Sequence, residues 1–71
     1  MLFRSLRRAI KSFMRTLREQ NAIVFLQKYW YMRTISQIAE DLGMSETAVK
    51  ASLRRTREKL KDYLEKEGFD L

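Results

Sequence analysis

The feature that most constrains the fold of this chain is the segment 34–54, which reads T-I-S-Q-I-A-E-D-L-G-M-S-E-T-A-V-K-A-S-L-R. Apolar residues at positions 35, 38, 39 and 42 recur at three- and four-residue spacing, as on one face of a short helix. Thr34 can cap this helix through its hydroxyl, and Gln37 can bond the cap in return. Gly43 suits the left-handed residue that commonly ends a helix. The pattern predicts a helix over residues 35–42.

A second helix is expected to follow almost at once, over residues 46–66. Ser45 is a further N-cap residue, and Glu46 places a negative charge at the positive end of the helix. The apolar stripe of this helix is formed by Val49, Leu53, Leu60 and Leu64. Two closely linked helices, with small residues where their backbones approach, are typical of a helix-turn-helix. The alternative is an ordinary helical hairpin that binds no ligand.

The outward face of the second helix favours DNA over the hairpin without a ligand. At about 100° per residue, Thr47, Lys50, Ala51 and Arg54 lie away from the apolar stripe. Threonine, lysine and arginine reach base edges or phosphates in the major groove, and alanine can contact a thymine methyl group. A small and basic face near a helix N-terminus therefore predicts entry into a major groove.

Length and composition narrow the fold class and exclude most chemistry. A chain of 71 residues makes one small domain. The absence of proline, with only two glycines, favours helices joined by tight turns. Without cysteine or histidine there is no disulfide framework and no usual zinc, haem or general-base site. We therefore expect no metal, no cofactor, no small-molecule substrate and no enzymatic activity. No apolar run approaches the roughly 20 residues that span a membrane.

The net charge of +6 is unevenly distributed. Residues 1–18 carry six basic side chains and no acidic one, whereas the other nine basic residues are balanced by nine acidic ones. Basic zones on a domain with a pI near 10.1 favour a polyanionic partner, with nucleic acid as the first choice. The basic and acid-free N-terminus is also compatible with a transit peptide or a membrane-surface helix, which is the weaker interpretation.

Two further helices are expected before the helix-turn-helix, over residues 2–15 and 17–32. The sequence T-L-R-E at 16–19 has the spacing of a capping box at the start of the second of them. Its aromatic residues Tyr29, Trp30 and Tyr31 are expected in or at the edge of the core. Gly68 should end the last helix, with Phe69 and Leu71 packed back on it or frayed. The prediction is a single all-α domain over residues 1–71, a small three- to four-helical bundle.

Three runs of this sequence resemble a known protein family. The runs that carry the resemblance are V-F-L-x-K-Y-W at 24–30, T-x-x-x-I-A-x-x-L-G-M-S-x-x-x-V-K at 34–50 and L-R-R-T-R-E-K-L at 53–60. Together they are similar to region 4 of bacterial sigma factors, most of all to the extracytoplasmic-function type. The helix-turn-helix alone is shared with other regulators, so the flanking runs make the resemblance more specific.

The resemblance implies a function and a set of partners. Region 4 recognises the upstream (−35) promoter element and docks on the flap of the RNA polymerase β subunit. The expected partners are therefore double-stranded promoter DNA and the polymerase core, with an anti-sigma factor as a further candidate, in a bacterial cytoplasm. By position, the DNA-binding residues are Ser45, Glu46, Thr47, Lys50, Ala51 and Arg54, with Arg55 and Arg57 as neighbours of phosphates.

The chain also departs from the family pattern. The family usually has Leu-Pro before its second helix, where this chain has Leu17-Arg18, and Ala22 replaces an arginine. The region that melts promoter DNA has no counterpart here, so the chain alone is not expected to initiate transcription. It is either a domain of a longer sigma factor or a stand-alone relative. The alternative function is a protein-interaction module that keeps the fold but binds the polymerase flap or a regulatory protein instead of reading DNA.

Overall fold

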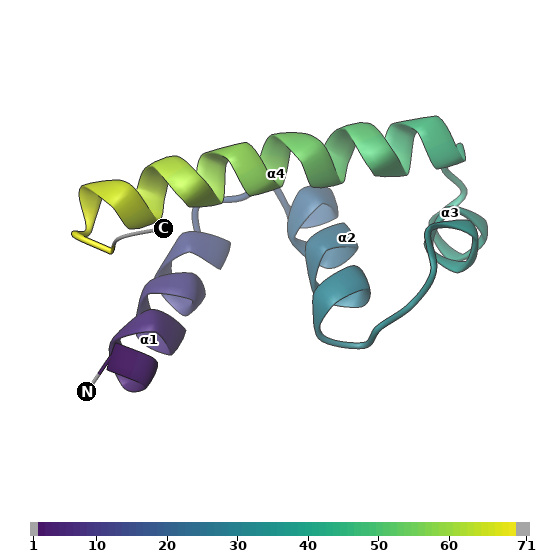
Figure 1. Cartoon of the computed structure of the whole chain (residues 1–71). Coiled ribbons are helices and arrows are strands. Elements are labelled where there is room, and N and C mark those ends of the chain that lie inside the picture. The colour runs from purple at the N-terminus through teal and green to yellow at the C-terminus, as the bar shows by residue number, and fades with distance from the viewer. Residues whose placement is uncertain (1, 70–71) are drawn as a thin grey trace.

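The computed structural model describes residues 2–69 and contains four helices in that range. They are α1 (Leu2–Met14), α2 (Glu19–Tyr29), α3 (Ile35–Leu42) and α4 (Glu46–Lys66). The long helix α4 contacts each of the other three. Figure 1 shows α1 and α2 on the same side of α4, with α3 near its N-terminal end. The predicted all-α, four-helix architecture with a C-terminal helix-turn-helix is confirmed.

Local hydrogen bonds at residues that the sequence predicts as caps close both ends of α3. The Gln37 amide donates to Thr34 Oγ1 at 3.1 Å, and the Thr34 amide donates to Gln37 Oε1 at 2.9 Å, which completes the capping box. At the other end of α3, the Met44 amide donates to the Ala39 carbonyl at 2.9 Å. Gly43 adopts the left-handed conformation at φ 65°, which closes a Schellman-type helix end.

Replacing Gly43 by alanine should destabilise the domain by about 1 kcal/mol, because an L-residue with a Cβ pays a steric cost in the left-handed region. A Cβ at this position would meet nothing within 4 Å, so the backbone conformation alone carries the cost. Urea denaturation followed by circular dichroism measures the change. Gly43→Asn should lose less, since asparagine tolerates the left-handed region better. Equal stability of Gly43→Ala and the parent would contradict the assigned conformation.

The core of the helix-turn-helix joins α2, α3 and α4. Ser45 caps α4 by accepting a hydrogen bond from the Ala48 amide at 3.1 Å. The buried cluster then consists of Val24, Ile38, Ala39, Val49 and Leu53, with Ile35, Leu42 and Met44 packed around it. In α4 the predicted stripe is partly wrong, because Leu60 is only half-buried while Ser52 and Thr56 are buried. The stripe is therefore more polar than its apolar residues suggest.

A second set of contacts holds α1 against the C-terminal half of α4. Phe13 is almost fully buried, and its ring centroid lies 5.5 Å from that of Tyr63. Leu64, the residue after Tyr63, is also buried. Beyond α4, Phe69 is half-buried and its amide donates to the Leu64 carbonyl at 2.9 Å, so of the two predicted alternatives this residue is packed back and not frayed. Leu71 lies outside the described residues.

The predicted bounds of α2 are wrong at both ends, since this helix covers Glu19–Tyr29 and not 17–32. The T-L-R-E capping box does not form, because the Thr16 hydroxyl donates to the Phe13 carbonyl at 2.7 Å and closes the end of α1 instead. Arg18 holds the N-cap position without a side-chain cap. After Tyr29 the backbone leaves the helix, with Met32 at φ 56° and the Arg33 amide bonded to the Gln27 carbonyl at 3.0 Å. The predicted end of the first helix at residue 15 is one residue too long.

The aromatic residues at the end of α2 are not in the core. Trp30 is 67% exposed and Tyr31 61% exposed, and Tyr29 is also exposed. The prediction of core or core-edge positions is wrong for Trp30 and Tyr31, which follow the end of α2, whereas the Tyr29 ring lies at the core edge with its centroid 4.9 Å from that of the buried Phe25. Figure 1 shows the long loop that follows α2 and leads to α3.

Two polar contacts support the packing of the helices. The Ser52 hydroxyl donates to Asn21 Oδ1 at 2.8 Å, which links α4, the helix that carries the candidate site, to α2 in a partly buried place. Arg33 pairs with Asp41 and so ties the loop before α3 to the end of α3. Within residues 2–69, no helix has both the length and the apolar character needed to cross a membrane.

Candidate nucleic-acid interface

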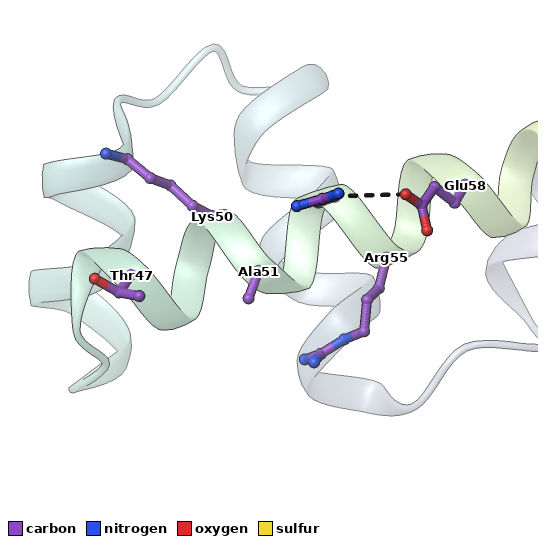
Figure 2. A pocket seen from close by; sticks show the side chains of 6 residues that line it. Thr47, Lys50, Ala51, Arg55 and Glu58 are labelled. Carbon is purple, nitrogen blue, oxygen red and sulfur yellow. Dashed lines mark ion pairs between the residues drawn. The ribbon is translucent and has the colours of Figure 1, made fainter.

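The outward face of the N-terminal half of α4 forms a shallow, open concavity. Its lining consists of Thr47, Lys50, Ala51, Arg54, Arg55 and Glu58. Five of these six are among the residues predicted to bind DNA, so the structure brings most of the predicted set onto one face. Figure 2 shows these side chains from close by, with Lys50 and Arg55 extending in different directions from the helix.

The predicted site residues at the start of α4 lie beside this concavity, not in its lining. The Ser45 hydroxyl caps α4 by accepting a hydrogen bond from the Ala48 amide. Glu46 is exposed in the first turn of α4. An acidic side chain at this end is stabilised by the helix dipole, so Glu46 has a structural reason for its position.

Arg57 does not join the other predicted residues. Its Nη1 donates to the Tyr29 hydroxyl at 3.3 Å, and it lines a different groove between α1, α2 and α4. At the helical phase of residue 57 a long side chain can turn either toward the solvent face or toward α2. The exposed end of α2 offers a hydroxyl partner, so the arginine lies on that side.

Sequence reasoning missed Glu58, which lines the concavity opposite the cations. Its Oε1 lies 3.6 Å from Arg54 Nε, and the two side chains are 68% and 79% exposed. Figure 2 marks this ion pair with a dashed line. The signal in the sequence is the four-residue spacing of opposite charges, which places two side chains on adjacent turns of a helix.

Packing, not a ligand, accounts for the position of this face. Between the lining residues, Val49, Ser52 and Leu53 point inward and are buried. The opposite side of α4 therefore faces solvent. Of the cations that line the concavity, Lys50 and Arg55 make no salt bridge among the described residues, and Arg54 pairs with Glu58. Among residues 2–69, no group of acidic side chains is arranged to hold a metal ion.

The diameter of an α-helix matches the width of a DNA groove. With its side chains, a helix such as α4 is about 10–12 Å across. The major groove of B-form DNA is about 12 Å wide and accepts an α-helix. In a helix-turn-helix the second helix enters the groove with its N-terminal residues near the bases, while the first helix crosses the backbone. The chain order of α3 and α4, joined by a short turn, is that of a helix-turn-helix.

A comparison with protein-family models agrees with this geometry. The model described as Sigma-70, region 4, matches residues 7–60 of the chain. The matched span runs from α1 to residue 60 of α4, so it includes α3, the turn after it and all six residues that line the concavity. No curated protein matches the chain.

Proposed function

This chain belongs to the sigma-70 region 4 family, and from that premise we propose that α4 binds the upstream (−35) promoter element within a sigma factor of the extracytoplasmic-function type. Region 4 is a non-catalytic domain that acts where a sigma factor contacts promoter DNA and RNA polymerase. The proposal adds the DNA element, the residues that contact it and a bacterial cytoplasmic setting.

The observation that carries the proposal is the concavity on α4 with its mixed lining. Thr47, Lys50 and Ala51 lie nearest the N-terminal end of the helix, where a helix-turn-helix meets base edges. Lysine can donate to guanine, and the threonine and alanine methyl groups can contact thymine. Arg55 extends from the side of the helix and suits a phosphate. The face thus combines side chains that can contact base edges with a side chain that can contact a DNA phosphate.

Fluorescence anisotropy tests the DNA-binding proposal directly. The full chain is titrated against a labelled random duplex and a duplex selected from a pool, over a salt series. We expect tighter binding to the selected duplex and a log–log salt slope that reflects several phosphate contacts. Equal binding to both duplexes, seen only at low salt, would contradict sequence-specific reading and leave charge attraction alone.

A second surface supports contact with RNA polymerase. A groove between α1, α2 and α4 is lined by apolar residues, among them Leu26, Trp30 and Leu60, and by four basic residues. The basic side chains are Arg7, Arg8, Lys11 and Arg57. We propose that the β flap docks here through an apolar helix with flanking acidic residues, because the lining includes no acid. An anti-sigma factor on the same groove would exclude polymerase.

Trp30→Ala should weaken binding of the chain to the polymerase core by at least tenfold, since an exposed tryptophan in a groove has the properties of an interface hot spot. Trp30 is 67% exposed, so the folded state should keep its stability. The measurement is binding of the labelled chain to the core enzyme, with DNA binding followed in parallel.

Tyr31→Ala is the matched control, because Tyr31 is a similarly exposed aromatic residue that does not line the groove. It should leave polymerase binding within about twofold of the parent. If the two variants lose polymerase binding equally, or neither does, the groove is not the docking surface.

A further inference from the structure

The ion pair between Arg54 and Glu58 has a geometry that leaves part of the arginine free. The carboxylate Oε1 lies 3.6 Å from Nε, the nitrogen nearest the side-chain stem. A guanidinium has five N–H donors in a fixed fork, so this contact leaves the two terminal nitrogens available. Side chains on a helix lean toward its N-terminus, which places Glu58 back over the preceding turn and over Arg54.

The pair lies on the outward face of α4, with both residues in the lining of the concavity. Glu58 lies one turn beyond Arg54, roughly 6 Å farther along the axis. A free arginine at this place would be attracted by any nearby phosphate, whatever the sequence. When an arginine is paired with a carboxylate through Nε, the net charge of the pair is close to zero, so its attraction to the DNA phosphates is weaker. Its two terminal nitrogens still match the O6 and N7 acceptors of guanine.

We propose that Arg54 reads a guanine of the bound DNA and that Glu58 is the positioning residue that holds it for this contact. The inference rests on the proposed function, since it needs α4 in the major groove. In water the exposed pair is weak. When the groove excludes water, the attraction between the two charges becomes stronger and keeps the guanidinium directed at the base. Glu58 thereby sets specificity without contacting DNA itself.

The test compares Glu58→Gln with the parent on three kinds of labelled duplex. These are a random duplex, the selected duplex and versions of the selected duplex in which each G·C pair is replaced in turn. For Glu58→Gln we expect affinity for the random duplex to rise by about two- to fivefold, because the freed arginine can take up a phosphate. Its log–log salt slope should become steeper by roughly 0.9, the contribution of one phosphate contact. Discrimination at one guanine should fall by at least about fivefold.

Two further variants separate positioning from a general charge effect. Glu65→Gln removes the same charge from an exposed residue of α4 outside the concavity, roughly 10 Å farther along the helix. It should keep full guanine discrimination. Arg54→Ala should lose discrimination at the same guanine as Glu58→Gln, and adding Glu58→Gln to Arg54→Ala should cause no further loss there. Circular dichroism checks that each variant keeps its helical content.

The outcomes distinguish this inference from the proposed function. If the parent prefers the selected duplex but Glu58→Gln behaves like Glu65→Gln, the inference is overturned and the proposed function stands. The same holds if Arg54→Ala and Glu58→Gln affect different base pairs. If the parent binds random and selected duplexes alike, both proposals are overturned.

Discussion

Replacing Ile38 by alanine should destabilise the domain by about 2–4 kcal/mol, the range typical of a large apolar side chain removed from a core. Ile38 is fully buried in the cluster that joins α2, α3 and α4. Its neighbours there come from three helices, so no single side chain can move in to fill the cavity. A domain of this size has only a few kcal/mol of net stability. Much of the Ile38→Ala chain should therefore be unfolded at physiological temperature.

Thermal and urea unfolding followed by circular dichroism measure this loss. The matched control is Ser36→Ala in the same helix, because the Ser36 side chain is exposed and outside the buried cluster. It should change the unfolding free energy by less than about 0.5 kcal/mol, as surface substitutions usually do. A loss below 1 kcal/mol for Ile38→Ala, by contrast, would mean that this cluster is not the centre of the fold.

The helix-turn-helix could be predicted from sequence because its determinants are local. The capping box of α3, the left-handed Gly43 and the Ser45 cap each depend on residues within five positions of one another. Bonds of this kind form with little help from the rest of the molecule. The bounds of α3 and α4 agree with the prediction for the same reason.

The bounds of α2 could not be predicted, because two neighbouring helices compete for one residue. Thr16 can cap the start of α2 or close the end of α1, and its hydroxyl bonds the Phe13 carbonyl. The burial of Phe13 against α4 fixes the end of α1 and decides the competition. A contact of this range is not visible in a local pattern.

The exposed aromatic residues illustrate a second limit of pattern reading. Tyr29, Trp30 and Tyr31 are large and partly apolar, so periodicity assigns them to a core. Trp30 and Tyr31 are exposed because they follow the end of α2, with the left-handed Met32 after them. Tyr29, the last residue of α2, accepts a hydrogen bond from Arg57 and lines the groove with it. The true end of α2 therefore has to be known before the positions of these side chains can be predicted.

Helical phase, on the other hand, was sufficient to predict which residues lie on the outward face of α4. Thr47, Lys50, Ala51 and Arg54 follow from 3.6-residue periodicity once the buried stripe is known. The same phase places Glu58 on that face, yet a charge pattern alone interprets it as part of a solvated lattice. Its pairing with Arg54 Nε becomes informative only with the atoms in place.

Lys50→Ala should weaken binding to the selected duplex by about 1–3 kcal/mol, if Lys50 donates to a base edge as proposed. Lys50 is exposed, lies in the concavity and makes no ion pair among the described residues, so the folded state should be little affected. Binding to the random duplex should fall much less. Anisotropy titrations of both duplexes over a salt series measure the two losses and the slope.

Lys59→Ala is the matched control for this prediction, since Lys59 is an exposed lysine of α4 that does not line the concavity. It removes the same charge but should leave the preference for the selected duplex unchanged. Uniform loss on both duplexes for Lys50→Ala, with a salt slope reduced by about one unit, would make Lys50 a phosphate contact and contradict base reading. Because charge, helix and side-chain length are matched, a difference between the two lysine variants can only come from position on the helix. A loss of sequence preference confined to Lys50→Ala would therefore identify the face of α4 that enters the groove.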